Sequence, residues 1–315
     1  MNALNLFTKA YACLHNYPGV PYWILTPMRR IVRYGANQCL PKYLEKVHRQ
    51  HRVNGEGIIV SFTSFPGRIQ HVWKVVESLK NQSIRPEKII LWLSKEQFAS
   101  ADDIPQSLKE CEDSLFDIRM VAGDIRSHKK YYYAMQEFTD KTIVTCDDDI
   151  YYHPNTLLKL VQASKRYPGC ITANVTKQIA YNKNGELLPY LQWNKKFEAY
   201  SSRNRVQIGV GGVLYPPHSL YHLVLREDLF MRLAPLADDL WLNLMARLNR
   251  TPVVQTGLHL NCLPIKNEGP ALSAVNNGTE NMNDQQIAQM REWLYAEGME
   301  DVFGAHYQVR NQMGG

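Results

Sequence analysis

Short apolar runs alternate with stretches of helical periodicity between residues 57 and 175. The run 57–62 is apolar and rich in β-branched residues, which predicts a buried strand. Val72, Val75, Val76 and Leu79 follow at i, i+3, i+4 and i+7, the spacing of one apolar helix face. Further strands are predicted over 88–93, 118–121, 142–146 and 171–175, and further helices over 128–138 and from Pro154 through Val161. This alternation predicts an α/β fold, in which helices flank a mostly parallel sheet.

The two ends of the chain and the segment 176–235 depart from this rhythm. Residues 176–235 are richer in polar, aromatic, Gly and Pro residues, which is typical of long loops over a ligand site. A helix is expected after Asp238 and Asp239, a short strand over 253–255, and a last helix around residues 287–294. Segment boundaries are therefore expected near residues 55 and 260.

Residues 1–55 combine aromatic side chains with a basic cluster. Tyr22 and Trp23 precede Arg29, Arg30 and Arg33, and more basic residues follow up to Arg52. Pro and Gly over 18–21 must break any helix here. Two interpretations stay open: a pair of helices packed on the main domain, or an aromatic and basic surface that rests on an anionic membrane.

Composition and charge narrow the function classes. The 315 residues include 36 Lys plus Arg against 30 Asp plus Glu, so the formal net charge is +6. This mild excess lacks the concentrated basic stripe of a nucleic-acid binder, and no nucleic acid is expected as a partner. The sequence has no apolar run of the ~18 residues that a membrane span needs, and its start is a poor signal peptide. Six scattered cysteines without a C-x-x-C pair indicate free thiols and a cytoplasmic protein.

Three consecutive carboxylates directly follow the predicted strand 142–146. Asp147, Asp148 and Asp149 therefore lie at its C-terminal end, the edge where ligands bind in open α/β sheets. Adjacent carboxylates raise one another's pKa, so such a cluster is stable mainly when a cation neutralises it. Mn²⁺ and Mg²⁺ prefer oxygen ligands and often bridge to phosphate, so a metal-bound diphosphate is predicted here. The competing interpretation is an acidic turn that caps the helix near Pro154, but a cap needs only one Asp.

The order of these motifs resembles the GT-A type of metal-dependent glycosyltransferases, in particular a bacterial subgroup that builds capsule, O-antigen or other surface polysaccharide. The likeness covers residues 57–260 and rests on five segments in order: 59–68, 79–91, 143–152 with its Asp-x-Asp motif, 209–217 and 237–241. It implies a Rossmann-like GT-A sheet with N-terminal and C-terminal helical extensions. It also implies a catalytic domain over 56–260, with a nucleotide-binding half (56–150) and an acceptor half (151–260), between extensions over 1–55 and 261–315.

The resemblance assigns the metal ligands. It implies that Asp149 ligates Mn²⁺ or Mg²⁺, that Asp147 contacts the ribose or the metal's water shell, and that Asp148 faces the sugar. Many relatives complete the metal shell with a histidine from the C-terminal region, and His259 is the candidate here. A lone histidine is more often structural, so both interpretations of His259 stay open.

Donor-binding residues are expected on the loop after the first strand and at the start of the helix 128–138. Ser61, Thr63 and Arg68 lie where the base and ribose of a nucleotide would stack, although Arg68 equally suits a surface position. Resembling sequences carry a lysine near Lys130, where a cation would neutralise the diphosphate leaving group. A solvated basic helix end is the alternative.

The acceptor side is expected around the segments 209–217 and 237–241. Relatives that invert the anomeric centre keep an acidic pair here, and the resemblance implies that Asp239 is the general base. Asp238 is then an acceptor contact or the cap of the following helix, and Trp241 an acceptor contact. Gly211 and Gly212 have little side chain, which would let the backbone approach a sugar closely, or form a tight bend.

The resemblance implies an inverting transfer of a sugar from a nucleotide donor, a UDP-sugar first of all, to a glycan or lipid-linked glycan. A sugar nucleotidyltransferase is the nearest enzymatic alternative, but it would carry a glycine-rich basic loop after the first strand, where 61–68 has one glycine. An inactive sugar-binding or scaffold relative is the other alternative. The chain is expected in the cytoplasm, at the inner face of the cell membrane if the N-terminal segment contacts lipid.

Overall fold

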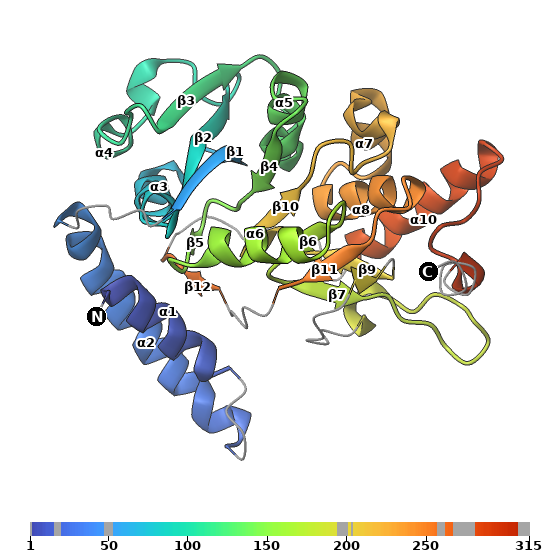
Figure 1. Cartoon of the computed structure of the whole chain (residues 1–315), viewed down its shortest axis with the longest axis horizontal. Coiled ribbons are helices and arrows are strands. Elements are labelled where there is room, and N and C mark those ends of the chain that lie inside the picture. Colours follow the sequence, from blue (N-terminus) through green and yellow to red (C-terminus); the bar gives the residue numbers. More distant parts are fainter. Residues whose placement is uncertain are drawn as a thin grey trace.

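A mixed eight-stranded sheet forms the centre of the computed structural model (Figure 1). The structure describes residues 2–15, 20–46, 53–193, 201–202, 204–256, 262–266 and 281–307. The strand order is β3-β2-β1-β4-β10-β6-β11-β8. The strands are β1 (Val53–Thr63), β2 (Ile84–Ser94), β3 (Phe116–Val121), β4 (Thr142–Thr145), β6 (Ile171–Ala173), β8 (Ser201–Ser202), β10 (Val213–Tyr215) and β11 (Val253–Gln255).

Most strands of this sheet run in one direction. Parallel pairs join β1 to β2 and β4, β2 to β3, and β6 to β11. Strand β10 is antiparallel to β4 and β6, and β8 is antiparallel to β11. The predicted α/β class with a mostly parallel sheet is confirmed. Strand β10 was expected as loop, because three residues are too few to show a period of two.

Helices cover both faces of the first half of the sheet. Successive side chains of a strand point to opposite faces. Val60 and Phe62 of β1 therefore pack with α3 (Val72–Lys80), whereas Ile59 packs on the other face with Ala134 of α5 (Lys129–Glu137). Helix α3 was predicted from its apolar spacing, and α5 as a helix over 128–138. Helix α3 begins four residues after Arg68, and Lys130 lies in the first turn of α5.

The remaining helices divide into predicted and unpredicted ones. Predicted were α6 (Thr156–Arg166), α8 (Asp238–Leu248) and α10 (Met282–Ala296). Helix α6 begins two residues after Pro154, with Asn155 at its N-cap, so Pro154 is not in its first turn as expected. Unpredicted elements are short: α4 (Gln106–Lys109), α7 (Glu227–Leu233), the pair β5 (Ile150–Tyr151) and β12 (Leu263–Pro264), and the pair β7 (Thr176–Gln178) and β9 (Arg205–Gln207).

The N-terminal segment forms a helical hairpin that projects from the body of the molecule (Figure 1). Its helices are α1 (Ala3–Cys13) and α2 (Tyr22–Lys46). Leu4 of α1 and Ala36, Leu40 and Leu44 of α2 belong to the same apolar core as β1 and α3. The hairpin therefore packs on the main body through one apolar face of each helix.

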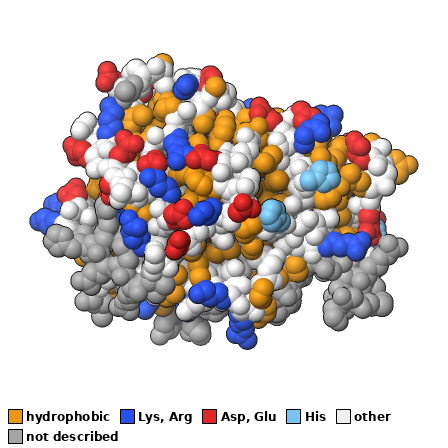
Figure 2. Space-filling view, turned by 45° about the horizontal axis from the view of Figure 1, so that its top comes forward, with side chains coloured by type: hydrophobic (Ala, Val, Ile, Leu, Met, Phe, Trp, Pro, Cys, Tyr) orange, Lys and Arg blue, Asp and Glu red, His pale blue; other side chains and the backbone are white. Residues whose placement is uncertain are grey.

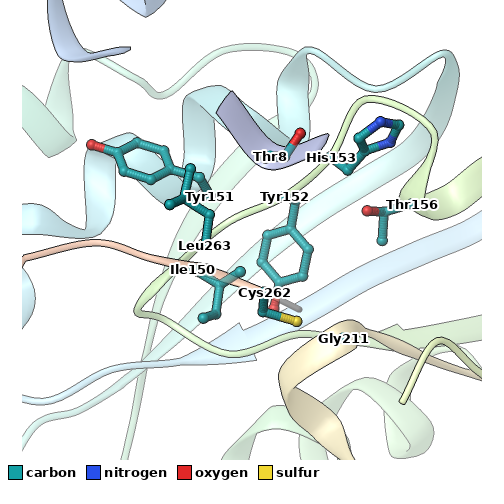
Figure 3. A pocket seen from close by; sticks show the side chains of 9 residues that line it. All are labelled: Thr8, Ile150, Tyr151, Tyr152, His153, Thr156, Gly211, Cys262 and Leu263. Carbon is teal, nitrogen blue, oxygen red and sulfur yellow. The ribbon is translucent and has the colours of Figure 1, made fainter. Parts of the chain in front are cut away.

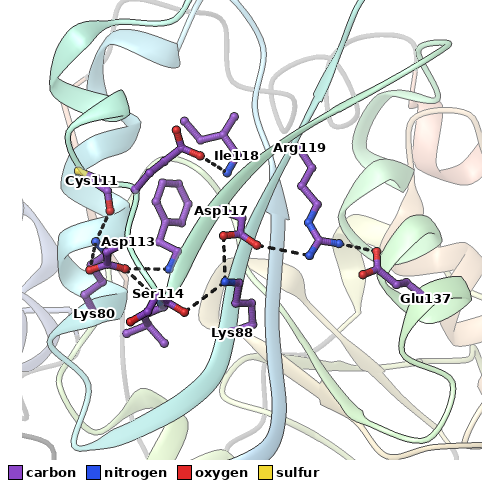
Figure 4. A network of polar contacts seen from close by, with 12 residues as sticks. Lys80, Lys88, Cys111, Asp113, Ser114, Asp117, Ile118, Arg119 and Glu137 are labelled. Carbon is purple, nitrogen blue, oxygen red and sulfur yellow. Dashed lines mark hydrogen bonds and ion pairs between the residues drawn. The ribbon is translucent and has the colours of Figure 1, made fainter.

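A polar network protects the outer edge of the sheet (Figure 4). The Lys80 side chain is buried and its Nζ lies 3.0 Å from Asp113 Oδ2, while also donating to the Cys111 carbonyl. On the edge strand β3, Asp117 pairs with Lys88 at 2.9 Å, and Arg119 pairs with Glu137. Charged side chains on an edge strand oppose pairing with another chain. Figure 2 shows the same mixture of acidic and basic side chains across one face of the molecule.

Two sequence expectations concern membranes and thiols. None of the described helices is both long and apolar enough to cross a membrane. All six cysteines lie among the described residues and are free.

Candidate active site

The acidic loop that follows β4 is held in place by the strand and by a tyrosine. The Cys146 N–H donates to the Ser61 carbonyl at 3.1 Å, which extends the contact between β4 and β1 by one residue. The Asp147 N–H donates to the Tyr152 hydroxyl at 2.7 Å, and this hydroxyl is buried. Asp147, Asp148 and Asp149 therefore leave the sheet at the C-terminal end of β4, where the sequence placed them.

The guanidinium of Arg68 pairs with two of these carboxylates. Its Nη1 lies 2.6 Å from Asp148 Oδ1 and 3.0 Å from Asp149 Oδ2. Asp148 is buried and also accepts a hydrogen bond of 2.6 Å from Ser64 Oγ. Burial alone would lower the pKa of Arg68, but Asp148 and Asp149 outweigh it and raise that pKa. Arg68 thus stays charged and fixes the acidic loop against the loop after β1.

The three acidic side chains of this loop differ in environment. Asp148 points into the protein, toward Ser64 and Arg68, so it does not face the open side where the sequence interpretation placed a sugar. About a quarter of the Asp149 side chain is exposed, and burial together with repulsion from Asp147 raises the pKa of Asp149 to about 6. Asp147 keeps about 30% of its side chain exposed. Asp147 and Asp149 are therefore the two carboxylates of the loop that a ligand can reach.

Lys130 joins the acidic loop to Asp238 and Asp239 at the start of α8. Its Nζ lies 3.1 Å from Asp147 Oδ1 and 2.6 Å from Asp238 Oδ2. Burial alone would lower the pKa of Lys130, but the attraction of Asp147, Asp238 and Asp239 raises it well above the usual value. The Lys130 carbonyl accepts a hydrogen bond of 2.6 Å from Ser61 Oγ, which pins the start of α5 to β1. Lys130 is a buried ammonium group, held in its charged form by its carboxylate neighbours, and not a solvated helix end.

The pKa of Asp239 is raised further above its usual value than that of Asp149. The Oδ2 of Asp239 accepts a hydrogen bond of 2.9 Å from the Gly209 N–H, and its buried Oδ1 has no hydrogen-bond partner. Burial raises the pKa of Asp239 to about 7 against the opposing effect of Lys130, with repulsion from Asp238 and Asp147 adding to the rise. A carboxyl group with this pKa exchanges a proton near neutral pH.

Gly209 lies at the centre of these charged groups. A Cβ atom at this position would lie 2.9 Å from Lys130 Nζ, 3.1 Å from Asp239 Oδ1 and 3.3 Å from Asp147 Oδ1. Lys130, Asp147 and Asp239 thus converge on one point from α5, the loop after β4 and α8. We call Arg68, Lys130, Asp147, Asp148, Asp149, Asp238 and Asp239 the charged cluster.

Two residues expected at the donor are engaged inside the protein. Ser61 is fully buried, and besides donating to Lys130 its Oγ accepts a hydrogen bond of 2.9 Å from Trp92 Nε1. Thr63 is partly exposed, and its Oγ1 donates to the Trp92 carbonyl at 2.8 Å. Ser61 faces α5 because side chains alternate along β1, so it positions Lys130 and does not line an open nucleotide surface.

Three residues expected at the acceptor lie in the interior. The Trp241 side chain is fully buried, packs against Phe230 and donates from Nε1 to the Val224 carbonyl at 3.0 Å. Gly211 and Gly212 are buried too, and a Cβ at Gly211 would meet Val175 Cγ2 at 2.8 Å, so the close approach is to protein and not to a sugar. Gly212 has a φ of 83°, which requires a glycine at the bend into β10. All three residues are buried in the structure, which gives no support to the expectation that they contact an acceptor.

Asp238 also differs from its expected place. The N-cap of α8 is Ala237 and makes no side-chain capping bond, so Asp238 does not cap the helix. Its carboxylate is buried and pairs with Lys130, which turns it away from an acceptor. Asp238 and Asp239 nevertheless occupy the first turn of α8, where the helix dipole favours negative charge.

The donor set of the charged cluster suits a hard divalent cation. When all its groups are ionised, five carboxylates face two cations, so the cluster carries an excess of negative charge. Within the described part of the chain, no group of three or more His, Cys, Asp or Glu side chains is arranged to hold a metal ion by itself. A cation would therefore take oxygens of Asp147 and Asp149 and complete its shell with phosphate and water, as Mg²⁺ commonly does. His259 lies outside the described residues.

Several residues of the site were not anticipated from the sequence. Ser64 and Tyr152 hold the acidic loop, and the tyrosine pair 151–152 close behind the acids is a signal that could have identified Tyr152. Helix α10 braces both loops beside Asp239: Asp284 accepts from the Tyr190 N–H at 2.7 Å, and Gln286 accepts from the Leu236 N–H at 2.9 Å. These bracing contacts span about 50 residues or more in sequence, so no local pattern predicts them.

A small pocket borders the segment that follows the acidic loop (Figure 3). Its lining comes from β5 and the residues after it, from β12 and the residue before it, from Gly211 before β10 and from Thr8 of α1. The lining residues are Thr8, Ile150, Tyr151, Tyr152, His153, Thr156, Gly211, Cys262 and Leu263. His153 Nε2 forms a hydrogen bond of 2.7 Å with Asn5 Oδ1 of α1. The lining has no carboxylate, so the pocket is a packing joint between the hairpin and the body and not part of the charged cluster.

Comparisons with known proteins give only distant similarities. No protein-family model and no curated protein matches the chain. Among solved structures, glucosyl-3-phosphoglycerate synthase from Mycobacterium tuberculosis, in complex with Mn²⁺, UDP and phosphoglyceric acid, matches with 12% identity and a TM-score of 0.37 over 80% of each chain. CMP:2-keto-3-deoxy-manno-octonic acid synthetase with CTP matches with 12% identity and a TM-score of 0.39 over 64% of this chain and 91% of that one. The 4-diphosphocytidyl-2C-methyl-D-erythritol synthase of Anaerococcus prevotii matches with 11% identity and a TM-score of 0.39, over 76% and 97%. Similarities this low establish neither a family nor an activity for this chain.

Proposed function

We propose that this protein is an inverting, divalent-cation-dependent glycosyltransferase, which moves a sugar from a nucleoside diphosphate donor to a hydroxyl group of a glycan. The observation that supports it is the convergence on Gly209 of a charged lysine, a reachable carboxylate of the acidic loop and a carboxyl group with a pKa of about 7. These are the three parts that the reaction needs: a cation for the leaving group, a ligand for a metal and a base for the acceptor.

The proposed base is Asp239. Both Asp238 and Asp239 lie at the start of α8, but Asp238 is tied to Lys130 at 2.6 Å and stays a counter-ion. Asp239 uses one oxygen for the Gly209 N–H and has the other without a partner, so a lone pair remains for a proton. In the proposed step the acceptor oxygen attacks the anomeric carbon while the bond from that carbon to the diphosphate oxygen breaks. The acceptor proton passes to Asp239, and the electron pair leaves with the nucleoside diphosphate.

The proposed role of Lys130 is to meet the negative charge that develops on the leaving group. Its ammonium is held by Asp147 and Asp238, so it needs little reorganisation when a phosphate arrives. Asp147 and Asp149 are the proposed ligands of Mn²⁺ or Mg²⁺, and a bound cation of this kind would screen the diphosphate charge as a Lewis acid. Arg68 acts in this proposal by holding the acidic loop, because both of its carboxylate partners belong to that loop.

The same proposal extends to the donor, the acceptor and the location of the protein. A UDP-sugar is the proposed donor, and Thr63, partly exposed beside Trp92, is the proposed contact on the nucleotide side. The proposed acceptor is a growing surface polysaccharide, free or lipid-linked, on the cytoplasmic side of the cell membrane. His259 is retained as a candidate third metal ligand.

The test is a panel of nucleotide sugars incubated with a mixture of glycan acceptors, with Mn²⁺, with Mg²⁺ and with a chelator. Release of nucleoside diphosphate that stops with chelator and returns with added metal supports the proposal, and Asp149→Ala should then lose metal-dependent donor binding while it stays folded. Release of pyrophosphate from a nucleoside triphosphate and a sugar phosphate would instead identify a sugar nucleotidyltransferase. Donor binding without any turnover would identify an inactive sugar-binding relative. A product that retains the anomeric configuration would contradict the single displacement.

A further inference from the structure

Helix α2 exposes an apolar face on the side opposite its packed face. Trp23 is 75% exposed, Ile31 71% and Tyr34 69%. Exposed aromatic and aliphatic side chains of this size are unusual on a soluble surface, and a contiguous group of them marks an interaction site. Of the nine large apolar side chains exposed in the described part of the chain, six belong to this helix: Tyr22, Trp23, Ile24, Met28, Ile31 and Tyr34.

Four exposed residues of α2 form one stripe along the helix. Trp23, Pro27, Ile31 and Tyr34 are spaced at i, i+4, i+8 and i+11, so they lie above one another on one side. The buried residues Leu25, Ala36 and Leu40 lie on the opposite side. Packing on the main body therefore accounts for only one of the two apolar faces of α2. The stripe begins at the outer end of the hairpin, away from the body (Figure 1).

Charge indicates what the free face contacts. From residue 2 to residue 46 the chain contains one acidic residue, Glu45, against six basic ones: Lys9, Arg29, Arg30, Arg33, Lys42 and Lys46. Arg30 and Arg33 are exposed and flank the stripe on the same helix. An apolar stripe bordered by arginines is the pattern of a helix that lies in the interface of an anionic membrane.

We propose that α2 docks on the surface of a bilayer rich in anionic phospholipid. Trp23, Ile31 and Tyr34 enter the boundary between head groups and acyl chains, while Arg30 and Arg33 contact the phosphates. A symmetric dimer through this face would bring the arginines of two copies together, which is unfavourable, so lipid is the better occupant than a second copy. The inference rests on α2 alone and holds whatever reaction the charged cluster carries out.

The test is flotation of the full-length protein with neutral phosphatidylcholine vesicles and with vesicles that also contain phosphatidylglycerol. Arg30→Gln with Arg33→Gln should weaken binding to the anionic vesicles about thirtyfold, since each basic residue near such a surface contributes about fivefold. Trp23→Ser with Ile31→Ser should weaken it at least about tenfold, because apolar area is lost. Matched controls with the same chemistry elsewhere are Lys165→Gln with Arg166→Gln on α6, and Leu191→Ser with Tyr295→Ser, all at exposed positions.

Binding that needs phosphatidylglycerol, weakens with salt and is lost in the α2 variants but kept in the controls supports the proposal. Equal binding to neutral vesicles, or equal loss in the controls, overturns it. Light scattering provides the second measurement: a dimer that Trp23→Ser with Ile31→Ser converts to a monomer would assign the face to another copy of the chain. Nucleoside diphosphate release on a soluble acceptor should be unchanged in all α2 variants, so failure of the docking proposal is distinguishable from failure of the transferase proposal.

Discussion

Lys130 Nζ lies 2.6 Å from Asp238 Oδ2 and 3.1 Å from Asp147 Oδ1, so a single ammonium connects the acidic loop after β4 to the start of α8. The Lys130 side chain is almost fully buried. Asp147 and Asp238 would repel each other without this cation, and so would Asp239, which lies beside them. Lys130 is therefore the residue that holds Asp147 and the start of α8 together, while Arg68 holds Asp148 and Asp149.

Replacement of this cation should cost stability. Lys130→Met keeps most of the length of the side chain but leaves the buried carboxylate of Asp238 without its counter-ion. We expect a loss of roughly 3–5 kcal/mol in the free energy of unfolding, measured by urea denaturation at neutral pH. The loss should shrink in acid, where the carboxylates take up protons. Lys88→Met on the sheet edge, a partly exposed lysine paired with Asp117, is the matched control and should cost about 1 kcal/mol or less.

Asp239→Asn should separate catalysis from binding. The substitution keeps the shape of the side chain and removes its basicity, so kcat should fall by about 10²–10⁴-fold while donor affinity stays near that of the native protein. Asp238→Asn is the neighbouring control: it weakens the hold on Lys130, so it should lower stability and change kcat less than Asp239→Asn does. Near-full activity of Asp239→Asn, with Asp238→Asn as the inactive variant, would reverse the assignment of the base.

The pH profile follows from the raised pKa of Asp239. A base works in its ionised form, so kcat/KM should rise with pH through a midpoint near 7 and flatten above it. An ordinary exposed aspartate would give a midpoint about three units lower. The steady-state profile of the native protein is the measurement, and the residual activity of Asp239→Asn should lose this midpoint. A flat profile between about pH 5 and pH 8 would show that no group of this kind limits the reaction.

Gly209→Ala tests the convergence of the charged groups. The added Cβ would lie 2.9 Å from Lys130 Nζ and 3.1 Å from Asp239 Oδ1, and Lys130 cannot yield easily because two carboxylates hold it. Activity should therefore fall by at least about tenfold, the effect of a misplacement near 1 Å or less. Gly35→Ala in α2 is the control, since its Cβ would meet only Phe7 at 3.5 Å and alanine favours a helix. Unchanged turnover in Gly209→Ala would contradict the described geometry.

Acid should destabilise the protein through His128. This ring is fully buried. Its Nδ1 forms a hydrogen bond with Tyr131 Oη and its Nε2 one with the Ala234 carbonyl, each at 2.8 Å. Burial lowers the pKa of His128 to about 4. The unfolded chain binds a proton below about pH 6.5 while the folded chain does not, so stability is lost as the pH falls from 6.5 toward 4. At pH 5 the deficit should be roughly 2 kcal/mol. His128→Gln should flatten this dependence in urea titrations, whereas His306→Gln, at an exposed position, should leave it unchanged.

The long elements could be predicted from the sequence because each carries its own period. Strands β1, β2 and β4 and helices α3, α5 and α8 satisfy a local pattern of apolar residues, and burial follows from that pattern. The three-residue strands β7, β9 and β10 exist because neighbouring strands pair with them. Their sequences alone contain no sign of that pairing.

The candidate site could be predicted to the same extent. The position of the acidic loop follows from the end of a strand. The sequence therefore predicts that Asp147 lies in the same site as Lys130 and Asp239. The inward turn of Asp148 was not, because Ser64 and Arg68, which hold it, lie 80 or more residues earlier. The burial of Trp241 did have a signal: apolar residues cover most of the circumference of α8, which is typical of a largely buried helix.

The charged cluster also has a consequence for synthesis of the chain on the ribosome. Arg68 leaves the ribosome 80 residues before its partner Asp148, and Lys130 leaves it 108 residues before its partner Asp238. Until α8 has left the exit tunnel, the start of α5 carries an ammonium with one carboxylate partner in place of two. Strands β1 and β2 and helix α3 share one apolar core and can pack before α8 is made, but the charged cluster is complete only once α8 has joined it. We therefore expect chains truncated before α8 to be cut by protease at this edge more readily than the full-length protein.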